Sequence, residues 1–255
     1  MKATFTVLSC HFGDPFWVTQ MVNRVDRFST LERVQSIFLV DQNRKDAVSK
    51  LGTLPRVDRI VRYPIDEAQT AMLGHDHPAS LDRVCREIIS TSHVLIMDSD
   101  TLLLTEKWQH LLDAALSRAD CVLAGDSKWG LSHPCFMAIP VEALSYCDFS
   151  AGVIPLGIDT GRLVGYQLST AGFSVDIMRP VRAFKGLRGD HYLGASILHV
   201  GSASFASATD QKLRRRARPL SDSVVRRRVS DGSLRFTVRD RTCLLFERLA
   251  RLVRR

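Results

Sequence analysis

Long hydrophobic runs are missing from this sequence of 255 residues. No apolar stretch approaches the roughly 20 residues that a membrane-spanning helix needs. The first residues, MKATFTVLSCHF, have the character of a strand, and Asp14 follows them closely, so they do not fit a secretory signal. These absences predict a cytoplasmic protein.

Paired cysteine motifs are also missing. The six cysteines are scattered along the chain, no two are separated by only two residues, and most lie among apolar residues. This distribution favours buried free thiols over a disulfide framework or a zinc site.

The net charge of +8 is concentrated at one end of the chain. Residues 212–255 hold 15 Lys and Arg against 4 Asp and Glu, a net charge of +11, whereas residues 1–211 carry a net charge of −3. A helix over 241–255 would collect Leu245, Phe246, Leu249 and Val253 on one face and arginines on the other. Such a helix can lie on an anionic membrane surface or pack its apolar face on the rest of the protein, and both alternatives stay open.

Strands and helices alternate along the first half of the chain. Short apolar runs predict strands over 4–9, 36–40, 58–63, 93–97 and 121–124, and helical periodicity predicts helices over 14–28, 78–91 and 105–118. The second half is less regular, with strands expected over 135–139, 174–177 and 197–200 and a helix over 160–171. This alternation predicts an α/β fold with a mostly parallel sheet and helices on both faces.

Polar residues follow three of the predicted strands. Ser9 and His11 end the first strand, Asp41 and Asn43 follow the second, and the triplet Asp98-Ser99-Asp100 follows the fourth. Ligands bind at the carboxyl ends of the strands in open α/β sheets. Asp98 and Asp100 would lie on one side of an extended segment, which suits Mg²⁺ or Mn²⁺ with positions left for diphosphate oxygens. The alternative is a strand end with two solvated aspartates.

Five segments, taken in order, resemble the GT-A glycosyltransferases, particularly the family-2-like members. They are IFLVDQN, HPASLDRV, VLIMDSDTLL, GIDTGRLVGYQLSTAGF and HVGSAS. The resemblance implies a Rossmann-like GT-A domain over 1–205, with a nucleotide-sugar-binding half over 1–104 and an acceptor-binding half over 105–205. A basic, mainly helical extension would occupy 206–255.

The activity that the resemblance implies is metal-dependent transfer of one sugar from a nucleotide-diphosphate sugar to a glycan or lipid-linked acceptor. Cell-surface polysaccharide synthesis at the inner face of the membrane is the expected setting. The Gln-x-x-Arg-Trp signature of processive synthases is absent from the sequence, so we expect a non-processive enzyme. The resemblance, and not this absence, is the reason to expect inversion. The oligomeric state stays open, a homo-oligomer included.

The resemblance also implies roles for particular residues. Those expected to bind the nucleotide sugar are Ser9, His11, Asp41, Asn43, His77, Asp98 and Ser99. Asp98, Asp100 and His199 would bind the metal ion, and an imidazole ligand favours Mn²⁺ over Mg²⁺. His199 could instead be a hydrogen-bonded core histidine, and His191 is the second candidate ligand. Gly74 and Pro78 predict that His77 lies in a loop.

The acceptor side is less well defined in the sequence. Asp159 is the candidate catalytic base, although an aspartate at the start of a helix is equally typical of an N-cap. Trp129 and His133 lie where the resemblance implies an acceptor-binding loop. The base and the stereochemical outcome therefore stay open.

Three other functions compete with this interpretation. A phosphatase with a DxDGT-type nucleophile motif would need Thr four residues after Asp98, but Thr101 is three residues after it. A nucleotidyltransferase would need a glycine-rich basic loop after the first strand, where this chain has Ser9-Cys-His-Phe-Gly13. A nucleic-acid-binding protein would use the arginine-rich end, but no recognisable nucleic-acid-binding module accompanies it, so no nucleic-acid partner is expected.

Overall fold

The computed structural model describes residues 2–13, 15–43, 51–64, 76–85, 87, 90–126, 130–151, 160–181, 189–201 and 229–230. Its elements run in the order β1 (Phe5–His11), α1 (Pro15–Phe28), β2 (Val34–Asp41), β3 (Val57–Arg62), α4 (Asp76–Cys85), β4 (His93–Met97), β5 (Thr101–Leu103), α5 (Lys107–Leu116), β6 (Cys121–Gly125), β7 (Ser132–Pro140), the 3₁₀ helix η1 (Val141–Tyr146), α7 (Val164–Thr170), β8 (Val175–Met178), β9 (Asp190–Tyr192) and β10 (Ile197–His199).

Seven strands form the main sheet, in the order β3-β2-β1-β4-β7-β6-β8. Strands β3, β2, β1 and β4 are parallel to one another, and β6 is parallel to β8. Strand β7 runs antiparallel to both of its neighbours, β4 and β6. The sheet is therefore mostly parallel, as the alternation of strands and helices predicted.

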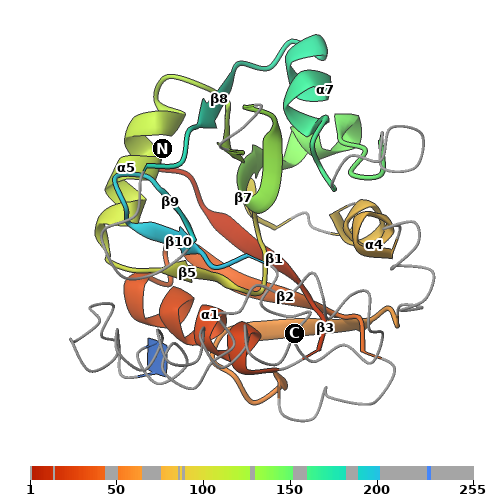
Figure 1. The fold of residues 1–255 in the computed structure, drawn as a ribbon, viewed down its shortest axis with the longest axis vertical. Helices are drawn as coiled ribbons and strands as arrows, with labels where there is room; N and C mark the ends of the chain where they lie inside the picture. Colours follow the sequence, from red (N-terminus) through yellow and green to blue (C-terminus); the bar gives the residue numbers. More distant parts are fainter. Residues whose placement is uncertain are drawn as a thin grey trace, which may run out of the picture.

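Helices cover both faces of this sheet, because the central strands are apolar on both sides. In β1, Phe5 and Val7 join a core cluster with α1 and α5, whereas Leu8 and Cys10 join a second cluster with α4 and α7. Such alternation is the geometry of an extended strand, whose successive side chains point to opposite faces. Figure 1 shows α1 and α5 on one side of the sheet and α4 and α7 on the other.

A second sheet of three short strands, β5-β10-β9, packs on the α1 side. It is antiparallel throughout. Arg24 of α1 donates hydrogen bonds to the carbonyls of Leu103 and of Val229, a buried residue of the C-terminal segment. The hydroxyl of Tyr192 donates to the carbonyl of Gly125 at 3.0 Å, which joins this small sheet to β6.

Every strand and helix that the sequence predicted before residue 201 is present, but some bounds and two strands differ. Helix α4 was predicted to run to residue 91 and ends at Cys85, and the loop predicted around His77 is wrong because Asp76 and His77 begin this helix. Pro78 occupies the first turn of α4, where proline is tolerated. Strands β5 and β9, of three residues each, were not predicted.

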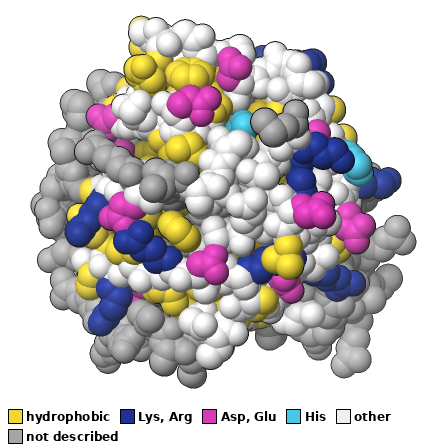
Figure 2. All heavy atoms as spheres, turned by 180° about the vertical axis from the view of Figure 1, so that it is seen from behind, with side chains coloured by type: hydrophobic (Ala, Val, Ile, Leu, Met, Phe, Trp, Pro, Cys, Tyr) yellow, Lys and Arg dark blue, Asp and Glu magenta, His cyan; other side chains and the backbone are white. Residues whose placement is uncertain are grey.

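The surface of the described residues mixes charges of both signs. Figure 2 shows Lys and Arg side chains interspersed with Asp and Glu over the rear face. Within the described residues, no helix is both long enough and apolar enough to cross a membrane. The predicted basic helix over 241–255 lies outside the described residues.

The two-sided core gives a prediction about stability. Leu95 of β4 is fully buried in the cluster with α1 and α5, so Leu95→Ala is expected to lower the free energy of unfolding by about 2–5 kcal/mol. Urea denaturation measures this change. Leu31, which is 66% exposed, is the matched control, and its replacement by Ala should change stability by less than about 0.5 kcal/mol. Equal losses in the two variants would contradict the placement of Leu95.

Candidate metal centre

The order of strands in the main sheet makes the carboxyl ends of β1 and β4 a topological switch point. The chain places β2 and β3 on one side of β1 and β4 on the other, so the connections leave β1 in opposite directions. Ligands bind at such a switch point in open α/β sheets. His11 ends β1, and the acidic triplet follows β4 at this edge.

The acidic triplet forms a tight turn between β4 and β5. The backbone N–H of Thr101 donates to the carbonyl of Asp98 at 2.9 Å. The carbonyl of Cys135 in β7 then accepts two hydrogen bonds, from the Oγ1 of Thr101 at 2.9 Å and from the N–H of Asp98 at 3.4 Å. The turn is thus attached to a buried strand of the main sheet.

The short strand β10 brings His199 to this turn. His199 pairs with Thr101 across the small sheet, and the N–H of Val200 donates to the carbonyl of Asp100 at 3.1 Å. The Nε2 of His199 lies 3.3 Å from Oδ2 of Asp98 and 3.4 Å from Oδ1 of Asp100. The three side chains offer ligand atoms that all lie within 4.8 Å of one another, close enough to hold one metal ion.

His133 and Cys135 of β7 lie on another side of His199. The His133 and His199 rings are 5.1 Å apart, and the N–H of Cys135 donates to Nδ1 of His133 at 3.1 Å. Burial alone would lower the pKa of His199, but negative charge at Cys135 and Asp100 raises this pKa well above its ordinary value. Burial alone would raise the pKa of Cys135, but the two imidazoles lower it. These side chains form one electrostatically coupled group.

The residues after β2 build a second part of the same edge. Oδ1 of Asp41 accepts hydrogen bonds from the N–H and the Nδ2 of Asn43, and Oδ1 of Asn43 accepts from the N–H of Gly13. Asp41 is fully buried, and among the described residues its Oδ2 has no hydrogen-bond partner. An unpaired buried carboxylate oxygen is costly unless a ligand supplies a donor.

Ser9 and His11 lie beside this carboxylate. They continue the face of β1 that carries Phe5 and Val7, and His11 pairs in register with Asp41. Both are fully buried, and the hydroxyl of Ser9 also lacks a hydrogen-bond partner within the described part of the chain. Because the small sheet packs on this same face, Ser9, His11 and the metal-binding group share one side of the main sheet.

No family model and no curated protein matches the sequence at a significant level. Solved structures do match. A mannosyltransferase of Pyrobaculum calidifontis, PcManGT, solved with GDP-Man and Mn²⁺, superposes with a TM-score of 0.51 at 12% identity over 69% of this chain and 55% of its own. GalNAc-T7, solved with UDP, GalNAc and Mn²⁺, superposes with a TM-score of 0.51 at 13% identity over 68% of this chain and 42% of its own.

The chain has a GT-A-type fold. The predicted fold class is therefore confirmed. The match spans about half of the length of PcManGT and less of GalNAc-T7, so it shows the fold of this chain and not its activity. Within this GT-A-type domain, the structure brings together Asp98, Asp100 and His199, the three predicted metal ligands, at the switch point of the sheet. Their roles stay predictions.

Other predicted site residues have different outcomes. Trp129 and Asp159 lie outside the described residues, and nothing is described of the side chain of His77. Ser99 is buried within the acidic turn. His191, the second candidate ligand, pairs with Leu198 of β10. Leu198 and His199 are successive strand residues and point to opposite faces of the small sheet, so His191 faces away from His199.

Cys135 is the residue at this centre that the sequence did not predict. It lies in the apolar run Cys135-Phe-Met-Ala-Ile139, which is typical of a buried structural thiol, and it is fully buried. The one available signal was its spacing of two from His133, which places both side chains near one another on an extended segment. His133, predicted to bind the acceptor, lies in β7 beside His199.

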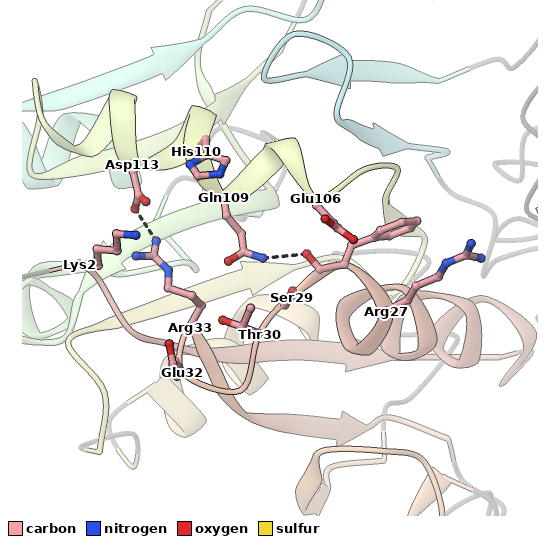
Figure 3. A pocket seen from close by; sticks show the side chains of 11 residues that line it. Lys2, Arg27, Ser29, Thr30, Glu32, Arg33, Glu106, Gln109, His110 and Asp113 are labelled. Atoms are coloured by element: carbon pink, nitrogen blue, oxygen red, sulfur yellow. Dashed lines mark hydrogen bonds and ion pairs between the residues drawn. The ribbon is translucent and has the colours of Figure 1, made fainter.

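A pocket of about 400 Å³ lies at the opposite, amino edge of the main sheet. Its lining includes Lys2, which precedes β1, and Arg33, which precedes β2, together with residues of α5, as Figure 3 shows. Arg33 forms an ion pair with Asp113 across it. This pocket contains none of the predicted site residues, so the switch point, and not the pocket, is the candidate site.

A glycine beside His199 gives a prediction for this centre. Gly189 has φ of +145°, and a Cβ there would lie 2.3 Å from the carbonyl oxygen of His199. Gly189→Ala is therefore expected to disturb the pairing of β9 with β10, lowering both the free energy of unfolding and the affinity for Mn²⁺.

Gly172 is the matched control, because its φ is +96° but a Cβ there would meet nothing within 4 Å. Gly172→Ala should lose stability only through backbone strain, of order 1 kcal/mol, and should keep Mn²⁺ affinity. Urea denaturation and Mn²⁺ titration compare the two variants. The predicted contact is wrong if Gly189→Ala behaves like Gly172→Ala in both measurements.

Proposed function

We propose that this protein is a metal-dependent glycosyltransferase that moves one sugar from a nucleotide-diphosphate sugar to a glycan or lipid-linked acceptor. The observation that carries the proposal is the convergence of Asp98, Asp100 and His199 at the switch point, on the same side of the sheet as Asp41. A cation-binding group at the same edge of the sheet as a buried carboxylate, one oxygen of which has no donor among the described residues, suits a ligand with a diphosphate at one end and a nucleoside at the other.

The donor set fits a divalent cation. Two carboxylates supply hard oxygen ligands, and the imidazole favours Mn²⁺ over Mg²⁺. When bound there, the cation supplies Lewis-acid stabilisation of negative charge on a diphosphate leaving group, worth several kcal/mol.

Binding of the nucleoside is the proposed task of the residues after β1 and β2. Oδ2 of Asp41 would accept a hydrogen bond from the base or ribose, because Asn43 already occupies Oδ1. Ser9 and His11 would line the same pocket, with His77 and Ser99 nearer the sugar or phosphates. The structures of PcManGT, solved with GDP-Man and Mn²⁺, and of GalNAc-T7, solved with UDP, GalNAc and Mn²⁺, support a nucleotide and a divalent cation as the ligands of this fold.

The chemistry at the acceptor is a further part of the proposal. Asp159 would act as general base toward an acceptor hydroxyl, giving inversion, and Trp129 would contact the acceptor. Release after one transfer agrees with the absence of the processive signature from the sequence. The basic segment 206–255 would hold the enzyme near an anionic membrane surface, where surface-glycan precursors are assembled.

Removing one metal ligand tests the cation. Asp100→Asn keeps the size of the side chain and removes its charge, so Mn²⁺ should bind more weakly and donor turnover should fall by about 100-fold or more, equivalent to roughly 3 kcal/mol of transition-state stabilisation. Donor hydrolysis or transfer assays and Mn²⁺ electron paramagnetic resonance measure the two effects.

Asp176→Asn is the control for that variant, because Asp176 is a partly exposed residue of β8 with only a 3.6 Å ion pair to Arg118. It should retain turnover and Mn²⁺ binding. Full turnover by Asp100→Asn with every nucleotide sugar that the wild type uses would refute the proposed function.

A panel of UDP, GDP, dTDP and CMP, each with and without Mn²⁺, tests the nucleotide. A nucleotide present at 100 times its dissociation constant should stabilise the protein by about 2.7 kcal/mol in a thermal shift measurement. Asp41→Asn should weaken binding of the preferred nucleotide by about 1.5–3 kcal/mol of binding free energy, which is the usual contribution of a hydrogen bond to a charged group.

Asp113→Asn is the control for Asp41→Asn, since Asp113 lies at the opposite edge of the sheet, paired with Arg33 (Figure 3). This control should lose some stability but keep its nucleotide affinity. Equal nucleotide affinity in Asp41→Asn and wild type would remove Asp41 from the binding site.

A further inference from the structure

A second group of metal-binding side chains shares His199 with the acidic pair. His133, Cys135 and His199 each offer one ligand atom, and these atoms all lie within 4.8 Å of one another. Of the three predicted metal ligands, His199 belongs to this group, whereas Asp98 and Asp100 do not. Two different donor sets therefore meet at one imidazole, oxygen ligands on one side and sulfur and nitrogen ligands on the other.

An irregularity in β7 brings His133 and Cys135 to this position. Strand β7 pairs Met137 with Leu123 but His133 with Ala124, so three residues of β7 lie opposite no residue of β6. Pro134 is one of them, and proline cannot donate a ladder hydrogen bond. Bulges of this kind redirect side chains and often lie next to functional sites.

The group is held in place on its inner side. Cys135 is fully buried, its N–H donates to Nδ1 of His133, and its carbonyl accepts from Asp98 and Thr101. His133 is only partly buried, which leaves the outer side of the group accessible. The donors are thus preorganised by backbone contacts that do not depend on an ion.

We propose that His133, Cys135 and His199 form a second cation subsite that takes a borderline divalent ion, Zn²⁺, and competes with the acidic pair for His199. Thiolate and imidazole are both ordinary Zn²⁺ ligands, and three protein ligands leave a fourth position open. The thiol of Cys135 loses its proton to solvent when the ion binds. Asp98 and Asp100 keep the preference for harder ions.

The competition follows from the shared ligand. An ion in the thiol-containing subsite takes His199 from an ion held by Asp98 and Asp100, so Zn²⁺ should displace Mn²⁺. If the proposed function is correct, Zn²⁺ would then inhibit transfer, and this consequence alone rests on the proposed function. The subsite itself is tested by metal binding, without any measurement of activity.

Co²⁺ is the probe for the thiol-containing subsite, because a Co²⁺–thiolate bond gives a charge-transfer absorption that oxygen and nitrogen ligands do not. The reduced full-length chain should show this absorption on adding Co²⁺ and lose it on adding Zn²⁺. Cys135→Ser should abolish it, and Asp100→Asn should retain it. Cys147→Ser is the matched control, since Cys147 is a free, partly buried thiol, and it should also retain the absorption.

His133→Asn is the second variant, in case Cys135→Ser does not fold. Asparagine keeps an acceptor for the N–H of Cys135, and His133 is less buried than Cys135. Zn²⁺ affinity should fall at least about tenfold in this variant, the lower end of what the loss of even an outer-shell partner costs. No charge-transfer absorption in the wild type, or its persistence in folded Cys135→Ser, would overturn the subsite.

Mn²⁺ electron paramagnetic resonance tests the sharing of His199. Adding Zn²⁺ should release bound Mn²⁺ from the wild type and from Cys147→Ser, but at much higher Zn²⁺ concentrations from Cys135→Ser. Equal release from all three would mean that Zn²⁺ simply replaces Mn²⁺ between the carboxylates, and would overturn the competition. Failure of transferase assays would leave these binding results unchanged, so the two proposals fail separately.

Discussion

Two hydrogen bonds to the carbonyl oxygen of Cys135 determine where the acidic turn lies at the end of β4. Asp98 donates one through its backbone N–H and Thr101 the other through its hydroxyl. The turn then positions His199, because Asp100 accepts from the N–H of Val200 at the end of β10. Every candidate ligand is therefore connected through the backbone to a buried central strand, which is the preorganisation that a metal site needs.

The direction of β7 explains why this strand can contribute to the centre at all. In an all-parallel sheet, the neighbour of β4 would deliver its carboxyl end to the ligand edge. Strand β7 is antiparallel, so its amino end lies there, and Phe136 pairs with Met97 at the last position of β4. Residues that precede β7, or begin it, then stand beside residues that follow β4.

The same reversal marks the limit of what the sequence could reveal about the site. Polar residues after a strand were recognised as site residues, and Asp98, Asp100 and Asp41 do lie at the carboxyl edge. Cys135 begins an apolar run instead of ending one, so the rule could not find it. The residues around Cys135 in the sequence do not show whether its thiol lies beside two imidazoles or among apolar side chains. The order of strands in the sheet determines these surroundings.

Fold class was predictable for a different reason. The apolar runs of β1, β2 and β4 are buried on both faces, and such runs separated by amphipathic helices fit few other architectures. The small sheet was harder, since strands of three residues such as β5 and β9 carry too little periodicity to recognise. Only its third strand, β10, was long and apolar enough, together with Val200, to be expected as a strand.

The donor arrangement around His199 has a consequence for metal selectivity. Mn²⁺ stands at the weak end of the divalent series for almost any donor set, and Zn²⁺ binds nitrogen and sulfur ligands more tightly. A site that relies on one imidazole and has a thiol within reach of that imidazole cannot select Mn²⁺ by affinity alone. Under the proposed function, selectivity for Mn²⁺ would come from the two carboxylates, from the donor diphosphate as a source of further oxygen ligands, and from the free concentrations of the two ions. With the proposed donor and the proposed subsite, metal choice would be coupled to donor occupancy, because each phosphate oxygen that binds would shift the balance from the sulfur side of His199 to the oxygen side.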